Sequence, residues 1–80
     1  MKCTVKAFGV TRDILGQREM MVEVNEGCTV GELKAMLFNQ FPRLHGLRSL
    51  FIAVNSEYAE DARLLAAGDE IALIPPVSGG

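Results

Sequence analysis

The residues with the clearest chemical potential lie at the carboxyl end of the sequence: Pro75, Pro76, Val77, Ser78, Gly79 and Gly80. A terminal carboxyl on Gly80 would be ionised at neutral pH. Such an anion can attack the α-phosphate of ATP, and the resulting acyl-adenylate can accept sulfur as a thiocarboxylate. Glycines pass a narrow channel in another protein because they lack a Cβ, and the two prolines favour an extended approach. We therefore expect an inserting tail with Gly80 as its reacting group.

The other side chains offer little chemistry. His45 is the single histidine, and the sequence places no Asp, Ser or Cys partner beside it, so we expect a loop residue without a catalytic role. Cys3 and Cys28 are predicted to be small buried thiols in a reducing compartment. Without a Cys/His cluster we expect no metal site. We also expect no bound cofactor and no catalytic side chains.

Composition narrows the class of protein. A chain of 80 residues predicts one domain with a thin core and little room for a deep substrate pocket. The formal net charge is -2, and the eight Lys and Arg residues are scattered, which argues against nucleic-acid binding. No apolar stretch approaches a membrane span and no signal peptide is evident. We expect a cytoplasmic protein.

The first half of the sequence predicts a hairpin followed by a helix. Residues 2–9 and 17–25 alternate with a period of two, as half-buried strands do, and 9–16 is predicted to be a polar connection between them. Thr29 and Glu32 match a capping box at a helix start, and Pro42 is expected to end that helix. The apolar stripe of the helix is predicted to comprise Val30, Leu33, Met36, Leu37 and Phe41.

The second half predicts two more strands. Residues 50–55 and 69–75 alternate, whereas 43–49 is predicted to be a loop and 57–68 mostly irregular, with Leu64 and Leu65 filling the core. Because two antiparallel strands, a helix and two further strands follow each other, we expect an α+β fold with a mixed sheet of four or five strands on one main helix. This is the β-grasp arrangement of ubiquitin, with a domain over 1–75 and a flexible Gly-Gly tail over 76–80.

The sequence resembles the small subunits of molybdopterin synthase along nearly its whole length. The most specific marker is the ending from Pro75 to Gly80, and the others are Phe8 with 11–16, 53–55 and 68–72. This resemblance implies an activating enzyme like ubiquitin E1 that uses ATP to adenylate Gly80, and a sulfur donor that converts Gly80 to a thiocarboxylate. It also implies a large synthase subunit that receives the tail, where sulfur passes to cyclic pyranopterin monophosphate. The expected assembly is a heterotetramer.

Three exposed residues are the candidates for contacting a partner. Phe8 and Ile74 fall on the strand faces opposite the predicted core and could form one apolar patch, with Met21 and Phe38 as weaker candidates. Arg12 could bridge to a partner carboxylate or be a solvated charge. The pair at 69–70 could meet a partner's basic groups or form a turn.

Three other functions fit the same sequence. The chain could carry sulfur for another pathway, such as a thiamine-like one, or act as a ubiquitin-like protein modifier with the same thiocarboxylate chemistry. It could also be a passive binding module whose glycines are incidental.

Overall fold

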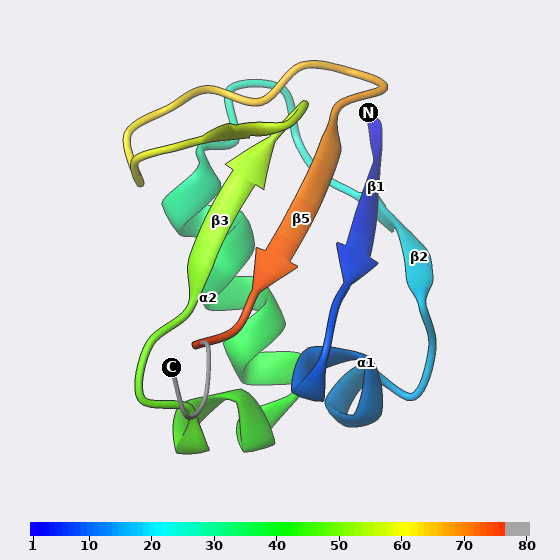
Figure 1. Cartoon of the computed structure of the whole chain (residues 1–80). Helices are drawn as coiled ribbons and strands as arrows, with labels where there is room; N and C mark the ends of the chain where they lie inside the picture. The colour runs from blue at the N-terminus through cyan, green and yellow to red at the C-terminus, as the bar shows by residue number, and fades with distance from the viewer. Residues whose placement is uncertain (77–80) are drawn as a thin grey trace.

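The structure, a computed structural model, describes residues 1–76. Figure 1 shows a sheet whose strands lie across one long helix. The elements are β1 (Lys2–Ala7), α1 (Val10–Leu15), β2 (Glu19–Glu23), α2 (Val30–Gln40), the 3₁₀ helix η1 (Pro42–Gly46), β3 (Phe51–Val54), β4 (Glu57–Tyr58) and β5 (Glu70–Ile74). Of the predicted tail, Val77, Ser78, Gly79 and Gly80 lie outside the described residues.

The sheet has the order β2-β1-β5-β3-β4 and is mixed. The β1 strand pairs antiparallel with β2 and parallel with β5, and β3 pairs antiparallel with both β5 and β4. A parallel pair needs a long crossover, and α2 lies within that crossover and packs on one face of the sheet (Figure 1). The predicted β-grasp fold is confirmed.

The core lies between α2 and the inner face of the sheet. The predicted strand alternation is confirmed, because Val5 and Ile71 are fully buried while their neighbours along each strand face outward. Each fully buried aliphatic side chain of this kind contributes about 1.5–3 kcal/mol to folding. Side chains at less than 2% exposure from several elements meet here: Val5, Val30, Leu33, Leu37, Leu44, Val54, Ile71 and Leu73.

The main helix begins as the sequence predicts. The Thr29 hydroxyl accepts the Glu32 backbone N–H at 3.2 Å, and the Glu32 carboxylate accepts the Thr29 N–H at 3.1 Å. The helix ends at Gln40, just before Phe41 and Pro42. Met36 was predicted to lie in the apolar stripe, but it is 37% exposed. At about 100° per residue, its side chain points roughly 90° away from the mean direction of Val30, Leu33 and Leu37.

The prediction of a polar connection over 9–16 was wrong, because six of these residues form α1. The Thr11 side chain is fully buried and its hydroxyl accepts the Phe8 N–H at 2.8 Å, which fixes the first turn. Leu15 is buried, and Gly16 ends the helix at a φ of 77°. The polar residues between them form the solvent-facing side of a very short helix.

The connections in the second half also contain more structure than predicted. Residues 43–49 include most of η1, whose Leu44 is buried. Positive φ angles at Asn55 and Ser56 make the tight turn that pairs β4 with β3. Leu65 is buried, but Leu64 is 64% exposed, so its predicted core position was wrong. Adjacent residues of an extended segment point to opposite sides, and only one of the two leucines can face the core.

Candidate functional site

The chain leaves the sheet at Ile74, the last residue of β5, which lies between β1 and β3. Strand pairing stops before Pro75, as the missing N–H of proline requires. Gly9 has a φ of +55°, and a Cβ added there would lie 3.2 Å from the Cγ of Pro75. The backbone before α1 therefore packs closely against Pro75 and fixes the position from which the chain continues.

Apolar side chains beside this exit lie on the sheet face that α2 leaves uncovered. Because Ala7 pairs with Leu73, the next residues Phe8 and Ile74 follow side by side, as the alternation predicts. Phe51 pairs with Ile74 from the other side. The outer-face patch, as we name it, comprises Phe8 (46% exposed), Phe51 (55%), Tyr58 (73%) and the half-buried Ile74.

Sequence reasoning missed two members of this patch. Phe51 and Tyr58 contact each other edge to face, with ring centroids 6.0 Å apart. Phe51 carried a usable signal, since it falls on the opposite phase to Ile52 in a predicted strand. Tyr58 carried none, because β4 has two residues and was not predicted.

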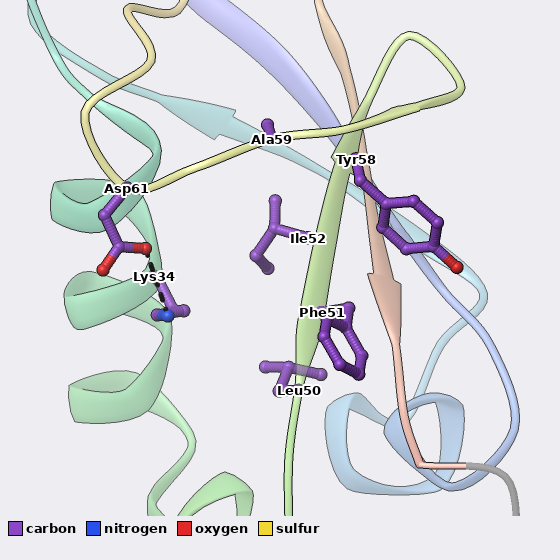
Figure 2. Close-up of a pocket in the computed structure, with 7 residues that line it drawn as sticks. All are labelled: Lys34, Leu50, Phe51, Ile52, Tyr58, Ala59 and Asp61. Carbon is purple, nitrogen blue, oxygen red and sulfur yellow. Dashed lines mark ion pairs between the residues drawn. The ribbon is translucent and has the colours of Figure 1, made fainter.

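A groove of about 360 Å³ continues from the patch around the edge of the sheet toward α2. In Figure 2, Leu50 and Ile52 point into the space beside α2, while the Phe51 and Tyr58 rings lie on the other side of β3. The Lys34 ammonium and the Asp61 carboxylate form an ion pair of 3.2 Å across the groove. The groove walls are mainly apolar, and their two charges neutralise each other.

Arg12 lies on α1 and is exposed. Beside it, Lys6 pairs with Glu70 through a contact of 2.8 Å between Nζ and Oε1. Glu70 therefore has a partner within the chain. The site at the end of β1 thus combines exposed aromatic surface with positive charge.

The acidic pair at 69–70 was predicted either to meet a partner's basic groups or to form a turn. The structure places Asp69 in a turn. Its carboxylate accepts the Ala66 backbone N–H at 2.8 Å and the Asn55 side-chain amide at 2.9 Å. The hydrogen bond from Ala66, and to a smaller extent the one from Asn55, holds the pKa of Asp69 below its ordinary value. Asn55 in turn accepts the Glu70 N–H. The network ties the turn between β3 and β4 to the start of β5, and so helps to keep Tyr58 in place.

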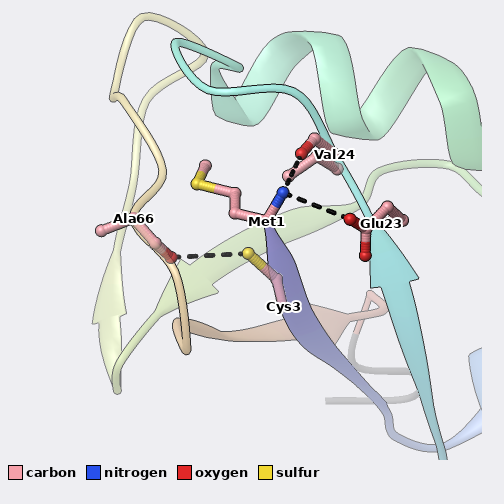
Figure 3. Close-up of polar contacts among 5 residues, drawn as sticks. All are labelled: Met1, Cys3, Glu23, Val24 and Ala66. Carbon is pink, nitrogen blue, oxygen red and sulfur yellow. Dashed lines mark hydrogen bonds and ion pairs between the residues drawn. The ribbon is translucent and has the colours of Figure 1, made fainter.

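The two cysteines are free and lie away from the outer-face patch. Cys3 is buried as predicted and its Sγ lies 3.5 Å from the Ala66 carbonyl oxygen, near the amino group of Met1 that donates to Val24 (Figure 3). Cys28 is only partly buried, so the prediction for it was wrong in degree. Burial is the main cause that raises the pKa of both thiols, which makes them poorer nucleophiles.

His45 lies in η1 instead of the predicted loop and is exposed. Its ring meets the half-buried Phe38 edge to face at 4.8 Å. Phe38 packs against the core and lies on α2, away from the outer-face patch, so the structure does not bring it together with Phe8. Over residues 1–76, no His, Cys, Asp and Glu side chains group closely enough to hold a metal ion. No helix in that range is long and apolar enough to cross a membrane.

Comparison with known proteins assigns the family. The model of the ThiS family matches residues 5–80. A molybdopterin synthase sulfur carrier subunit from Chlamydomonas reinhardtii is 34% identical over 83 residues, covering 100% of both chains.

Solved structures agree with the fold. The crystal structure of SAMP1 from Haloferax volcanii has a TM-score of 0.87 at 31% identity, covering 100% of both chains. One chain of a complex between subunits 1 and 2 of molybdopterin-converting factor from Helicobacter pylori is also similar. It has a TM-score of 0.72 at 30% identity, again over 100% of both chains. The chain therefore belongs to the ThiS family and has the ubiquitin-like β-grasp fold of its relatives.

Proposed function

We propose that this protein is a sulfur carrier in molybdopterin synthesis and that Gly80 carries the sulfur. The observation that supports this proposal most strongly is the end-to-end similarity to molybdopterin synthase sulfur carrier subunits. The outer-face patch beside the end of β5 adds a surface suited to a partner that receives the tail. The domain over 1–75 then serves for docking, and 76–80 serves for transfer.

The proposed chemistry has two steps before transfer. An E1-like adenylyltransferase binds ATP, and the Gly80 carboxylate attacks the α-phosphate, so that pyrophosphate leaves and an acyl-adenylate forms. A donor that supplies sulfide then attacks the acyl carbon, the carbon–oxygen bond to AMP breaks, and a thiocarboxylate remains. A donor that carries the sulfur as a persulfide would first form an acyl disulfide, which a thiol then cleaves to release the thiocarboxylate and a disulfide. This chain binds no cofactor in the scheme, because ATP is used by the activating enzyme.

The acceptor step takes place on the large synthase subunit. We propose that Pro75, Pro76, Val77, Ser78, Gly79 and Gly80 enter its active site and deliver sulfur to cyclic pyranopterin monophosphate. The catalytic side chains belong to that subunit, and the assembly is a heterotetramer of two copies of each chain. The related Helicobacter pylori structure is a complex of subunits 1 and 2 of molybdopterin-converting factor. The thiols of Cys3 and Cys28 are free, as is usual for proteins of the reducing cytoplasm, where we propose that this protein acts.

We propose that the outer-face patch and Arg12 bind the large synthase subunit. Phe8 and Ile74 flank the exit of the chain, and Phe51 and Tyr58 extend the same apolar surface. Exposed aromatic side chains of this kind supply much of the binding energy at protein interfaces. Arg12 supplies a charge at the rim, where a partner carboxylate can pair with it.

The test is the mass and reactivity of Gly80 in protein made together with its activating enzyme. A gain of roughly 16 Da is expected when sulfur replaces oxygen, but oxidation of Met or Cys adds a similar mass. Fragmentation must therefore place the gain on Gly80, and the group must react as a thioacid. A variant lacking Gly79 and Gly80 is the control, and it should fold normally and gain no sulfur. A plain carboxylate with ATP, activating enzyme and sulfur donor all present would overturn the proposal.

A second candidate is a ubiquitin-like modifier, because SAMP1 is similar over the whole chain and a relative at 33% identity is named small archaeal modifier protein 1. The same Gly80 chemistry would then end in isopeptide bonds to other proteins, or in sulfur delivery to another, thiamine-like pathway. Affinity purification from cells distinguishes these functions. Recovery of a large synthase subunit in stoichiometric amount supports the sulfur carrier of molybdopterin synthesis. A ladder of conjugated proteins supports the modifier.

A further inference from the structure

A basic hollow lies next to the outer-face patch, between α1 and the ends of β1 and β2. It has a volume of about 500 Å³. Its lining consists of Lys6, Ala7, Phe8, Arg12, Arg18 and Glu19. Arg12 and Arg18 also share the wall of a neighbouring hollow of about 420 Å³. Two exposed arginines, Arg12 on α1 and Arg18 in the connection just before β2, therefore line one surface beside Phe8.

Both arginines are attached to well-fixed backbone. The Arg18 carbonyl accepts the Ala7 N–H at 2.8 Å, which joins the start of β2 to the end of β1. Arg12 donates its N–H to the Gly9 carbonyl at 3.1 Å and accepts the Gly16 N–H at 2.8 Å within α1. These hydrogen bonds hold the two backbone positions, so that a partner would meet two arginine side chains that extend from fixed points of one surface.

Some of the positive charges of this hollow have no ion-pair partner within the described part of the chain. Lys6 is paired with Glu70, and the other ion pairs among residues 1–76 are those of Met1 with Glu23 and of Lys34 with Asp61. Asp13 and Glu19 line the two hollows but form no ion pair with either arginine. Arg12 and Arg18 are thus open to carboxylates from outside, in a protein whose net charge is -2.

We propose that Arg12 and Arg18 act together as a binding site for acidic side chains of the large synthase subunit. This inference rests on the proposed function and adds Arg18 and the chemistry of the partner surface to it. A guanidinium group binds a carboxylate through two parallel hydrogen bonds. Apolar contacts on Phe8 would exclude water beside these pairs and strengthen them. The continuity with the outer-face patch favours a protein partner over a free phosphate.

The test measures the affinity of the full-length protein for the large subunit of its own organism at several salt concentrations. Arg18→Glu and Arg12→Glu should each weaken binding about tenfold, mainly through a slower association rate, and should reduce its salt dependence. Arg18→Lys should recover part of the loss. The matched control is Arg63→Glu, which changes the net charge equally. Its carbonyl accepts the Val30 N–H at the start of α2, in the connection that Figure 1 shows at the opposite end of the sheet from α1.

The outcomes separate the two proposals. If the wild type binds the large subunit and Arg18→Glu binds equally well, the two-arginine site is overturned while the sulfur-carrier function stands. If Arg63→Glu weakens binding as much as Arg18→Glu, only general charge matters, and the site is again overturned. Binding of inorganic phosphate that depends on Arg18, with unchanged affinity for the large subunit, would reassign the site to phosphate. No binding by the wild type would overturn both proposals.

Discussion

Replacing Tyr58 by alanine should weaken binding of the large subunit far more than it weakens the fold. Tyr58 is 73% exposed, and a tyrosine at an interface buries about 150–250 Å² in total. Roughly 150 Å² therefore remains to be buried on docking, worth up to about 4 kcal/mol at about 25 cal/mol per Å². If the partner covers half of that area, the loss is about 2 kcal/mol, or about 30-fold in affinity.

The small covered area of Tyr58 limits how much the Tyr58→Ala substitution can destabilise the fold. About a quarter of the side chain is already covered, partly by the edge contact with Phe51. Its removal should lower the free energy of unfolding by about 1 kcal/mol. Calorimetric titration with the large subunit gives the affinity, and urea unfolding of the free protein gives the stability.

Leu64→Ala is the matched control, because Leu64 is 64% exposed and lies outside the patch, paired with Thr29 at the start of α2. It should bind the large subunit with wild-type affinity. Wild-type binding by Tyr58→Ala, or an equal loss of binding by Leu64→Ala, would refute the docking assignment. A loss of several kcal/mol in the stability of Tyr58→Ala would instead mean that the Tyr58 side chain packs in the fold.

Three further changes test the fold that supports the site. Thr29→Ala removes the capping box and should lower the free energy of unfolding in urea by about 1 kcal/mol. Gly9→Ala, at a φ of +55° and close to Pro75, should cost about 1–3 kcal/mol in the same assay, whereas Gly46→Ala, with open space around it, should cost less. Asp69 has a folded pKa below its ordinary value of 3.8, so its carboxylate stabilises the fold above about pH 4, and this contribution is lost as pH falls through the folded pKa. Asp69→Ala should therefore be less stable than the wild type at pH 7 by about 1 kcal/mol, and the difference should shrink in acid; a constant difference would contradict this assignment.

The sequence was sufficient for elements whose signals are local. The alternation around Val5 and Ile71 predicted which strand faces are buried, because a strand needs no distant contact to set its period. The capping box at Thr29 and Glu32 predicted the start of α2 for the same reason. These elements make up the mixed sheet and the helix, and they define the fold.

The remaining structure depends on contacts that the sequence does not display. The α1 helix has six residues and is fixed by the hydrogen bond of the Thr11 hydroxyl with Phe8. Isolated helices of this length are unstable in water, so no local pattern indicates them. The choice between Leu64 and Leu65 for the core depended on the direction of an irregular segment.

The candidate site was only partly predictable, for a related reason. Phe8 and Ile74 were identified from their phase along single strands, but the patch is completed by Phe51 and Tyr58 through the register of β3 with β5 and β4. Register between strands distant in sequence is not visible in either strand alone. Arg18 was missed because its proposed role depends on Arg12, which the fold places on the wall of the same hollow.

Docking and transfer should be separable in kinetics, because the proposed function assigns them to different parts of the chain. Residues 76–80 span at most about 17 Å when extended, so a partner held on the outer-face patch keeps the tail at a high local concentration near its own active site. A variant weakened in docking should transfer sulfur slowly at low concentration of the large subunit and recover at saturation. We expect this of Tyr58→Ala. Deletion of Gly80 removes the proposed reacting group, so no concentration of the large subunit should restore transfer. A Tyr58→Ala variant that also stays inactive at saturation would mean that the patch acts in transfer itself.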